Sequence, residues 1–143
     1  MITRNTPKLT LEGARAILAA AEKKAHAIKV PMNIAIVDAG AHLLAFIRMD
    51  GAKLSSVEVA LTKARAAALR WSPTGPSPAK GEPSAILSLG LSLATDNQLT
   101  PIRGGLPLVV DGQVVGGIGA SAGSEDEDVS VAQAGVDELK KFA

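Results

Sequence analysis

The apolar residues of this chain recur at helical spacing in three segments. Residues 11–28, 55–71 and 124–142 each have an apolar residue at every third or fourth position, with polar residues between them. Each segment also begins with a recognisable N-terminal signal: Thr10 as an N-cap, a capping box from Ser55 to Glu58, and a second capping box from Ser124 to Glu127. The pattern therefore predicts three amphipathic helices.

Two other segments have the pattern of β-hairpins. In residues 33–50, two apolar runs flank the turn DAGA, where Gly40 is expected to supply a positive φ. In residues 106–121, Asp111-Gly112 between valine-rich runs predicts a type I′ turn. The run that begins at Asn33 is apolar on both faces and should be a central strand. Alternation divides the strand after it into two faces, one with His42, Leu44, Phe46 and Arg48, the other with Leu43, Ala45, Ile47 and Met49.

The stretch between the second helix and the second hairpin is less regular. Residues 72–84 hold four prolines and two glycines, which predicts a long loop of the kind that forms lids or interface arms. Residues 85–101 suit either a strand or a short helix, and the helix is favoured. Because tight hairpins force antiparallel pairing, the whole order predicts an α+β fold in one domain, residues 1–143, with helices flanking a central antiparallel sheet.

Composition excludes several classes of function. The chain has no cysteine and two histidines, so thiolate chemistry and multi-histidine metal sites are excluded, and we predict no metal centre. A net charge of +1 and an aromatic content of 2% argue against a nucleic-acid partner. The N-terminus lacks a leader pattern and no long apolar run occurs, so we expect a cytoplasmic protein with no membrane partner. The many small residues bury little area each, which favours a homo-oligomer.

The glycine-rich stretch GGIGASAGSEDED, residues 116–128, raises the question of a phosphate loop. It lacks the spacing of a dinucleotide fingerprint and the lysine of a phosphate loop. Four acidic residues, Glu125 to Asp128, also occupy the helix N-terminus where a phosphate would bind. Its glycines instead favour close approach of either a flat ligand or a neighbouring backbone.

Three polar residues near these elements are open to more than one interpretation. His26 lies outside the apolar stripe, one turn after Glu22, and is interpreted as a solvated partner of that residue. Arg48 ends an apolar strand and is either an anion anchor or an exposed strand end. Lys63 flanks its helical stripe, which favours a side chain extended to solvent over a functional one.

Taken together, these segments resemble the GlcG/HbpS-like family, which includes haem-binding proteins and the C-terminal domain of PduO-type corrinoid proteins. The resemblance rests on IAIVDAGAHLLAFIRMDGA, on Lys63-Ala64, on GGLPLVVDGQVVGGIGASAG and on the acidic run after it, and it spans about residues 9–139. It implies a profilin-like fold and a homo-oligomer, often an octamer or another multiple of a dimer. Its ligands would be haem, another tetrapyrrole or corrinoid-related molecule, or a small organic acid.

The chain differs from the extracellular haem-sensing members in its lack of a secretory leader, and from the family pattern in Ser121-Ala122-Gly123, where members often carry Ser-Gly-Gly. With no cysteine or tyrosine, a haem ligand would have to be His26, His42, Met49 or a hydroxyl. The first hypothesis is therefore haem binding with one of these ligands and Arg48 on a propionate. The candidate ligand-binding residues are His42, Arg48, Met49, Lys63, Gly104, Gly105, Gly119 and Ser121.

The second hypothesis is a cofactor-independent lyase or isomerase acting on an aromatic or hydroxy acid, as in family members that resemble hydroxylaminobenzoate lyases. Arg48 would bind the carboxylate, and Asp50, Glu125 or Asp128 would act as general acid or base, although the clustered acids are also explained by helix capping. A third possibility is an oligomeric accessory protein without chemistry of its own.

Overall fold

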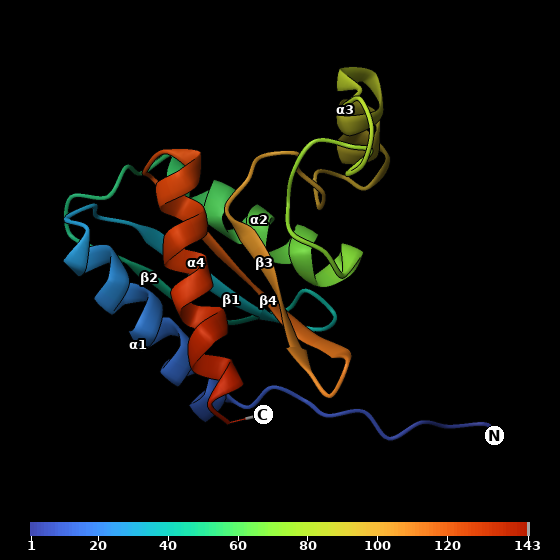
Figure 1. The fold of residues 1–143 in the computed structure, drawn as a ribbon, viewed down its shortest axis with the longest axis horizontal. Helices are drawn as coiled ribbons and strands as arrows, with labels where there is room; N and C mark the ends of the chain where they lie inside the picture. Colours follow the sequence, from blue (N-terminus) through green and yellow to red (C-terminus); the bar gives the residue numbers. More distant parts are fainter. Residues whose placement is uncertain (143) are drawn as a thin grey trace.

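Four strands form one antiparallel sheet in the computed structural model, which describes residues 1–142 (Figure 1). The strands are β1 (Asn33–Asp38), β2 (Leu43–Arg48), β3 (Gly105–Val110) and β4 (Gln113–Ser121), and their order across the sheet is β2-β1-β4-β3. Each hairpin forms as predicted, and the two hairpins join through antiparallel pairing of β1 with β4. The position of β1 inside the sheet confirms the prediction from its unbroken apolar run.

The helices lie on both faces of this sheet. Helices α1 (Leu11–Ala27) and α4 (Glu125–Lys140) pack side by side on one face, and α2 (Ser56–Arg70) covers the other (Figure 1). The α+β fold class and its flanking helices are thus as predicted. Within residues 1–142, none of the helices combines the length and the apolar character needed to span a bilayer.

The two faces of the sheet are packed with side chains of different size. Between the sheet and the α1–α4 pair lie branched aliphatic residues, among them Ile17, Ile34, Leu108, Ile118 and Val131. Between the sheet and α2 lie mostly small residues: Ala35, Val37, Ala64 and Ala68 are buried there, with Phe46 and Leu61 at the margin.

Glycines of β4 make the close packing of α2 possible. A Cβ atom at Gly117 would overlap the backbone oxygen of Ala64, and one at Gly119 would overlap that of Ala60. The backbone of α2 therefore contacts the backbone of β4 directly, and only glycine allows the two to lie so close.

Three local predictions for the first hairpin and its following helix are wrong. In the first turn the positive φ belongs to Ala41, at 69°, and not to Gly40, because the Asp38 carboxylate accepts hydrogen bonds from the Gly40 and His42 amides and fixes the turn. A bulge in β2 puts Leu44 on the α1–α4 side beside Ala45, so strict alternation fails there. Ser55 does precede α2, but its helical backbone (φ −60°, ψ −24°) makes no side-chain capping bond.

The second hairpin and the remaining helices agree with expectation. Asp111 and Gly112 both have positive φ, at 50° and 72°, as a type I′ turn requires. The predicted capping box of α4 is present, since the Ser124 and Glu127 side chains each accept a hydrogen bond from the other residue's amide. Ala122 has a φ of 122°, a backbone conformation that alanine rarely adopts.

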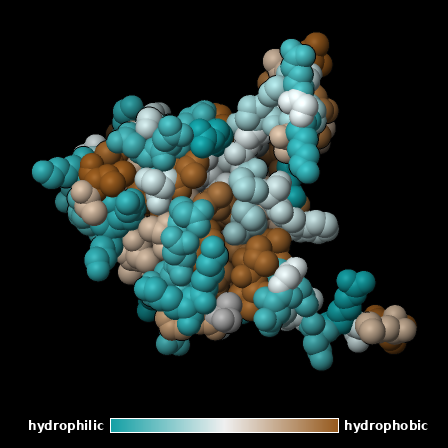
Figure 2. Space-filling view, in the orientation of Figure 1, coloured by the Kyte–Doolittle hydropathy of each residue, from teal (hydrophilic) through white to brown (hydrophobic). Residues whose placement is uncertain are grey.

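Helix α3 (Ala85–Ala94) confirms the helical interpretation of residues 85–101 and stands away from the rest of the molecule (Figure 1). It buries Ser88 but leaves several large apolar side chains in water. Figure 2 shows apolar residues at the outer edge of this arm. The loop before it, residues 71–84, has no regular structure.

Candidate functional site

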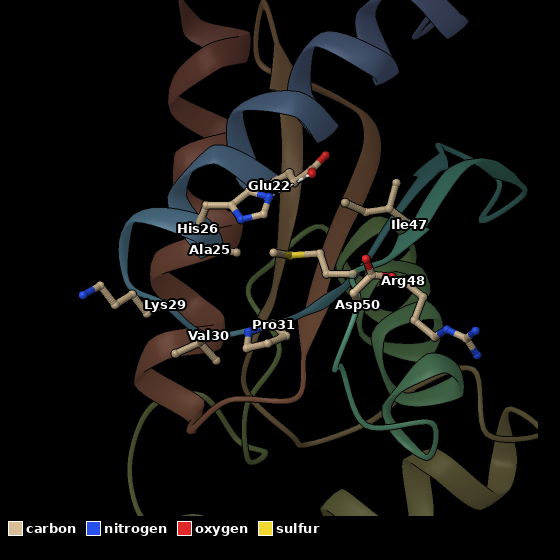
Figure 3. A pocket seen from close by; sticks show the side chains of 10 residues that line it. Glu22, Ala25, His26, Lys29, Val30, Pro31, Ile47, Arg48 and Asp50 are labelled. Atoms are coloured by element: carbon tan, nitrogen blue, oxygen red, sulfur yellow. Dashed lines mark hydrogen bonds and ion pairs between the residues drawn. The ribbon is translucent and has the colours of Figure 1, made fainter.

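A cleft of about 570 Å³ opens between the C-terminal end of α1, the loop after it and the end of β2 (Figure 3). It brings together four of the residues predicted to be functional, namely His26, Arg48, Met49 and Asp50. The other lining residues are Glu22, Ala25, Lys29, Val30, Pro31 and Ile47. Of these, Lys29 was missed by the sequence interpretation, although it follows His26 by three residues near the helix end.

His26 is held by its neighbour one helical turn away. Its Nε2 lies 3.1 Å from Oε2 of Glu22, and its side chain is 65% exposed, which confirms the predicted solvated pair. When the proton of the neutral ring is on Nε2, the bond to Glu22 orients the imidazole and leaves Nδ1 as an unprotonated acceptor. Nδ1 is then free to bind a metal.

A thioether and a guanidinium group in this cleft could also contact a ligand. The half-buried Met49 places Sδ 3.4 Å from the backbone N–H of Met32, which donates to it weakly. Arg48 is exposed at the end of the edge strand β2, and in residues 1–142 it forms no ion pair. Figure 3 shows Arg48 and Lys29 on opposite sides of the cleft, with their charged ends pointing outward.

His42 lies elsewhere, in the turn between β1 and β2. Its side chain is 82% exposed and its Nδ1 is 3.2 Å from Oδ1 of Asp38. Partial burial tends to raise the pKa of Asp38, but hydrogen bonds from the His42 and Gly40 amides, with the imidazole, hold that pKa below its ordinary value of 3.8. The structure thus gives His42 a partner in its own turn and does not bring it to the cleft with His26.

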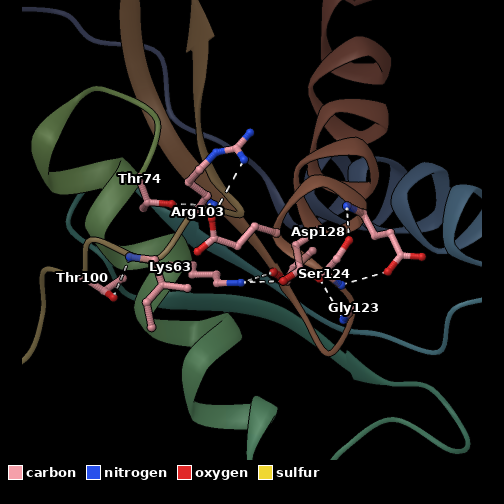
Figure 4. A network of polar contacts seen from close by, with 12 residues as sticks. Lys63, Thr74, Thr100, Arg103, Gly123, Ser124 and Asp128 are labelled. Carbon is pink, nitrogen blue, oxygen red and sulfur yellow. Dashed lines mark hydrogen bonds and ion pairs between the residues drawn. The ribbon is translucent and has the colours of Figure 1, made fainter. Parts of the chain in front are cut away.

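Lys63 is buried, and the prediction that it extends to solvent is wrong. Its Nζ donates to Oδ2 of Asp128 at 2.8 Å and to the backbone oxygen of Ala120 at 2.9 Å (Figure 4). The two side chains are 1% and 4% exposed. The flank of α2 faces the first turn of α4 across the end of β4, so Lys63 contacts the Asp128 carboxylate and not solvent.

Asp128 is fixed by contacts on both carboxylate oxygens. Its Oδ1 accepts a hydrogen bond from the Gly123 amide at 3.0 Å, while Oδ2 faces Lys63. Burial raises the pKa of Asp128 above 3.8 and outweighs the lowering by Lys63 and the Gly123 amide. A carboxyl group so enclosed has no route to a bound substrate.

The other acids at the start of α4 also have structural partners. Glu127 completes the capping box, while Asp126 and Glu125 lie 2.9 and 3.9 Å from Nη1 of Arg103. The acidic run is therefore explained by its structural role, in which it caps the first turn of α4 and pairs with Arg103.

The remaining candidates surround the Lys63–Asp128 pair. Gly104 has a φ of 127°, and a Cβ there would lie 2.7 Å from Nζ of Lys63. Gly105 and Gly119 are in contact with the backbone of α2, and Ser121 is buried at the end of β4, where it pairs with Asn33. None of these residues lines the cleft that contains His26.

Comparison with known proteins agrees with this architecture. A family model described as "Haem degrading protein HbpS-like" matches residues 9–137. Protein GlcG of Escherichia coli K12 is 36% identical over 113 residues, which cover 79% of this chain and 81% of GlcG.

Two solved structures extend the likeness to three dimensions. The crystal structure of HbpS has a TM-score of 0.80 at 31% identity, and the match covers 95% of this chain and 93% of the HbpS chain. A PduOC–haem complex has a TM-score of 0.78 at 26% identity, and the match covers 92% of this chain and 95% of the PduOC chain. With a family model matched over most of its length and relatives that share its fold, the chain belongs to the HbpS-like family.

Proposed function

We propose that this protein binds haem in the cleft between α1 and β2, with His26 as the axial ligand. The observation that carries the proposal is that this cleft places an imidazole, a thioether and two cationic side chains around an apolar floor. The haem complex of the related PduOC supports the choice of ligand.

The residues present fit the chemistry of a haem. Iron in haem proteins is bound by imidazole and by thioether sulfur, and His26 and Met49 supply both. Ala25, Val30, Pro31 and Ile47 offer apolar contacts to a porphyrin face, and Arg48 and Lys29 are placed for propionate carboxylates. Bound haem would add iron-centred redox chemistry to a chain whose own side chains have none.

Glu22 would act as a positioning residue. Imidazoles that ligate metals usually donate their second ring N–H to a carboxylate, which fixes the tautomer and makes the ligand more basic. The 3.1 Å contact between Glu22 and His26 already has this arrangement.

The cleft is open, so one protomer would cover only part of the ligand. We therefore extend the proposal to a homo-oligomer in which a second copy completes the enclosure. The apolar side chains of α3 support self-association, since Ile86, Leu89 and Leu93 are 87%, 60% and 68% exposed and recur at helical spacing.

The lyase alternative has less support from the geometry. Its proposed carboxylate anchor, Arg48, shares the cleft with Asp50, but Asp128 is enclosed by Lys63 and Glu125 lies beside Arg103. Asp50 is exposed, and Glu22, the other carboxylate of the cleft, is already paired with His26. Ligand binding is thus the better use of this cleft.

Hemin titration of the purified protein tests the proposal. We expect a saturable Soret shift in the wild type and its loss, or a change of coordination spectrum, in His26→Ala. His42→Ala is the matched control, because His42 is also exposed and also paired with an acid four residues away. It should bind hemin as the wild type does.

The proposal fails if the wild type gives no saturable shift, or if His26→Ala binds hemin with unchanged affinity and spectrum. Loss of the shift in His42→Ala alone would move the ligand to the turn between β1 and β2.

A further inference from the structure

A second cleft, of about 350 Å³, lies where the chain leaves α2 and returns toward β3. It shares no lining residue with the cleft that contains His26. Its walls come from the end of α2, from the proline-rich loop and from the segment after α3: Ala66, Arg70, Ser72, Pro73, Thr74, Gly75, Pro76, Ser77, Ala79, Thr100 and Arg103.

The charge of this cleft has one sign. Arg70 from the last turn of α2 and Arg103 from the segment before β3 are its charged lining residues, and no acidic residue lines it. Two guanidinium groups beside a concave surface raise the local concentration of anions and offer forked donors to a carboxylate.

The two arginines differ in how they are held. Arg70 donates from Nη1 to Oγ of Ser77 at 2.9 Å, and among residues 1–142 it has no carboxylate partner. Its remaining N–H groups are available to a ligand. Arg103 is held at Nη1 by Asp126 and Glu125, which do not line the cleft, so among residues 1–142 its Nε and Nη2 groups are the ones left for a ligand.

The polar walls are fixed before any ligand arrives. Thr74 is tied to the start of β3, because its amide donates to the Gly105 oxygen at 3.0 Å and its Oγ1 accepts from the Gly105 amide at 2.9 Å. Ser77 is tied to α3 through its amide, which donates to Oγ of Ser88 at 2.9 Å. Both residues are buried, so ligand binding would require little ordering of the loop.

The size and the apolar part of the cleft define the ligand. Its volume is near the lower end of the range for small-molecule sites, roughly 300 to 1,000 Å³. Ala66, Pro73, Pro76 and Ala79 add apolar contacts beside the two guanidinium groups. We propose that this cleft binds a small carboxylic acid with a short aliphatic body, whose carboxylate lies between Arg70 and Arg103.

Propionate and its neutral amide, propionamide, are the probes for this site. We expect propionate to shift the amide NMR signals of Thr74, Gly75 and Arg103 in a saturable manner, and propionamide to leave them unchanged. Arg70→Gln should weaken propionate binding about tenfold, the loss expected for one charge-assisted hydrogen-bonding partner. Arg15→Gln is the control, since it removes an exposed arginine of α1 that lines neither cleft, and it should leave the titration unchanged.

Equal shifts with propionamide, or an unchanged affinity in Arg70→Gln, would overturn the proposal. Tighter binding of inorganic phosphate than of propionate would overturn the assignment to carboxylic acids. Because Arg70 is exposed, its substitution should not unfold the protein, and the dispersion of the NMR spectrum verifies this. None of these outcomes depends on haem binding.

Discussion

Lys63 and Asp128 form an ion pair that is almost fully buried. Removing a charge from water costs several kcal/mol, and here the cost is offset by a 2.8 Å ion pair and by hydrogen bonds to Ala120 and from Gly123. The pair also joins α2, β4 and α4 at one point. Each charge therefore depends on the other for its place in the fold.

Lys63→Met should destabilise the protein by about 3 to 5 kcal/mol at neutral pH, because it leaves the Asp128 carboxylate buried and uncompensated. Without the lysine, the pKa of Asp128 should rise further above 3.8. When the pKa of a carboxyl group is higher in the folded than in the unfolded state, the protein loses stability as the pH rises from the unfolded pKa to the folded pKa. The deficit should thus be smallest near pH 4 and grow toward neutrality, as urea unfolding at several pH values would show.

The double variant Lys63→Met with Asp128→Asn is the control for this prediction. Because it removes both charges, it should recover much of the lost stability and most of the pH dependence should disappear. A deficit in Lys63→Met that is independent of pH would contradict the ion-pair explanation and indicate lost packing alone.

Residue by residue, the sequence predicts local pairs well and distant ones poorly. The contact of His26 with Glu22 follows from helical spacing alone. The partner of Lys63 lies 65 residues further along the chain. Periodicity gives the direction of Lys63 around α2 but not the element that packs there. Lys29 and Arg48 likewise line one cleft only because the end of α1 and the end of β2 lie at the same side of the molecule.

At the scale of elements, the spacing between α2 and β4 is set by backbone atoms. Gly119→Ala should therefore cost about 1 to 3 kcal/mol, since its Cβ would overlap Ala60 and the surroundings must shift to admit it. Gly90→Ala is the matched control, because that glycine lies in α3 with open space around it and alanine favours a helix. Equal effects of the two changes on the urea midpoint would argue against this close packing.

The existence and type of the elements could be predicted because each has a period or a turn signal of its own. The type I′ turn at Asp111-Gly112 is one example, and the capping box of α4 is another. Where two local signals compete, the prediction fails. In the first hairpin Gly40 suggested the positive φ, but the Asp38 carboxylate organises the turn so that Ala41 adopts it.

At the scale of the whole molecule, the projecting helix α3 is the feature that a monomer explains least. Its apolar residues lie on an arm with a single buried position, Ser88. Leu89→Asp should convert a wild-type oligomer into smaller species in sedimentation velocity, because it places a charge in the face that we propose to be covered. Leu54→Asp, which alters another exposed leucine, before α2, should leave the sedimentation coefficient unchanged. A monomeric wild type would contradict self-association.

The unequal packing of the two sheet faces has a consequence for how sequences of this fold can diverge. On the α1–α4 side, one aliphatic residue can be exchanged for another of similar volume with modest cost. On the α2 side, Gly117 and Gly119 face main-chain atoms that cannot move aside for a larger residue. Neutral drift should therefore accumulate on one side of the sheet while the other side retains its small residues.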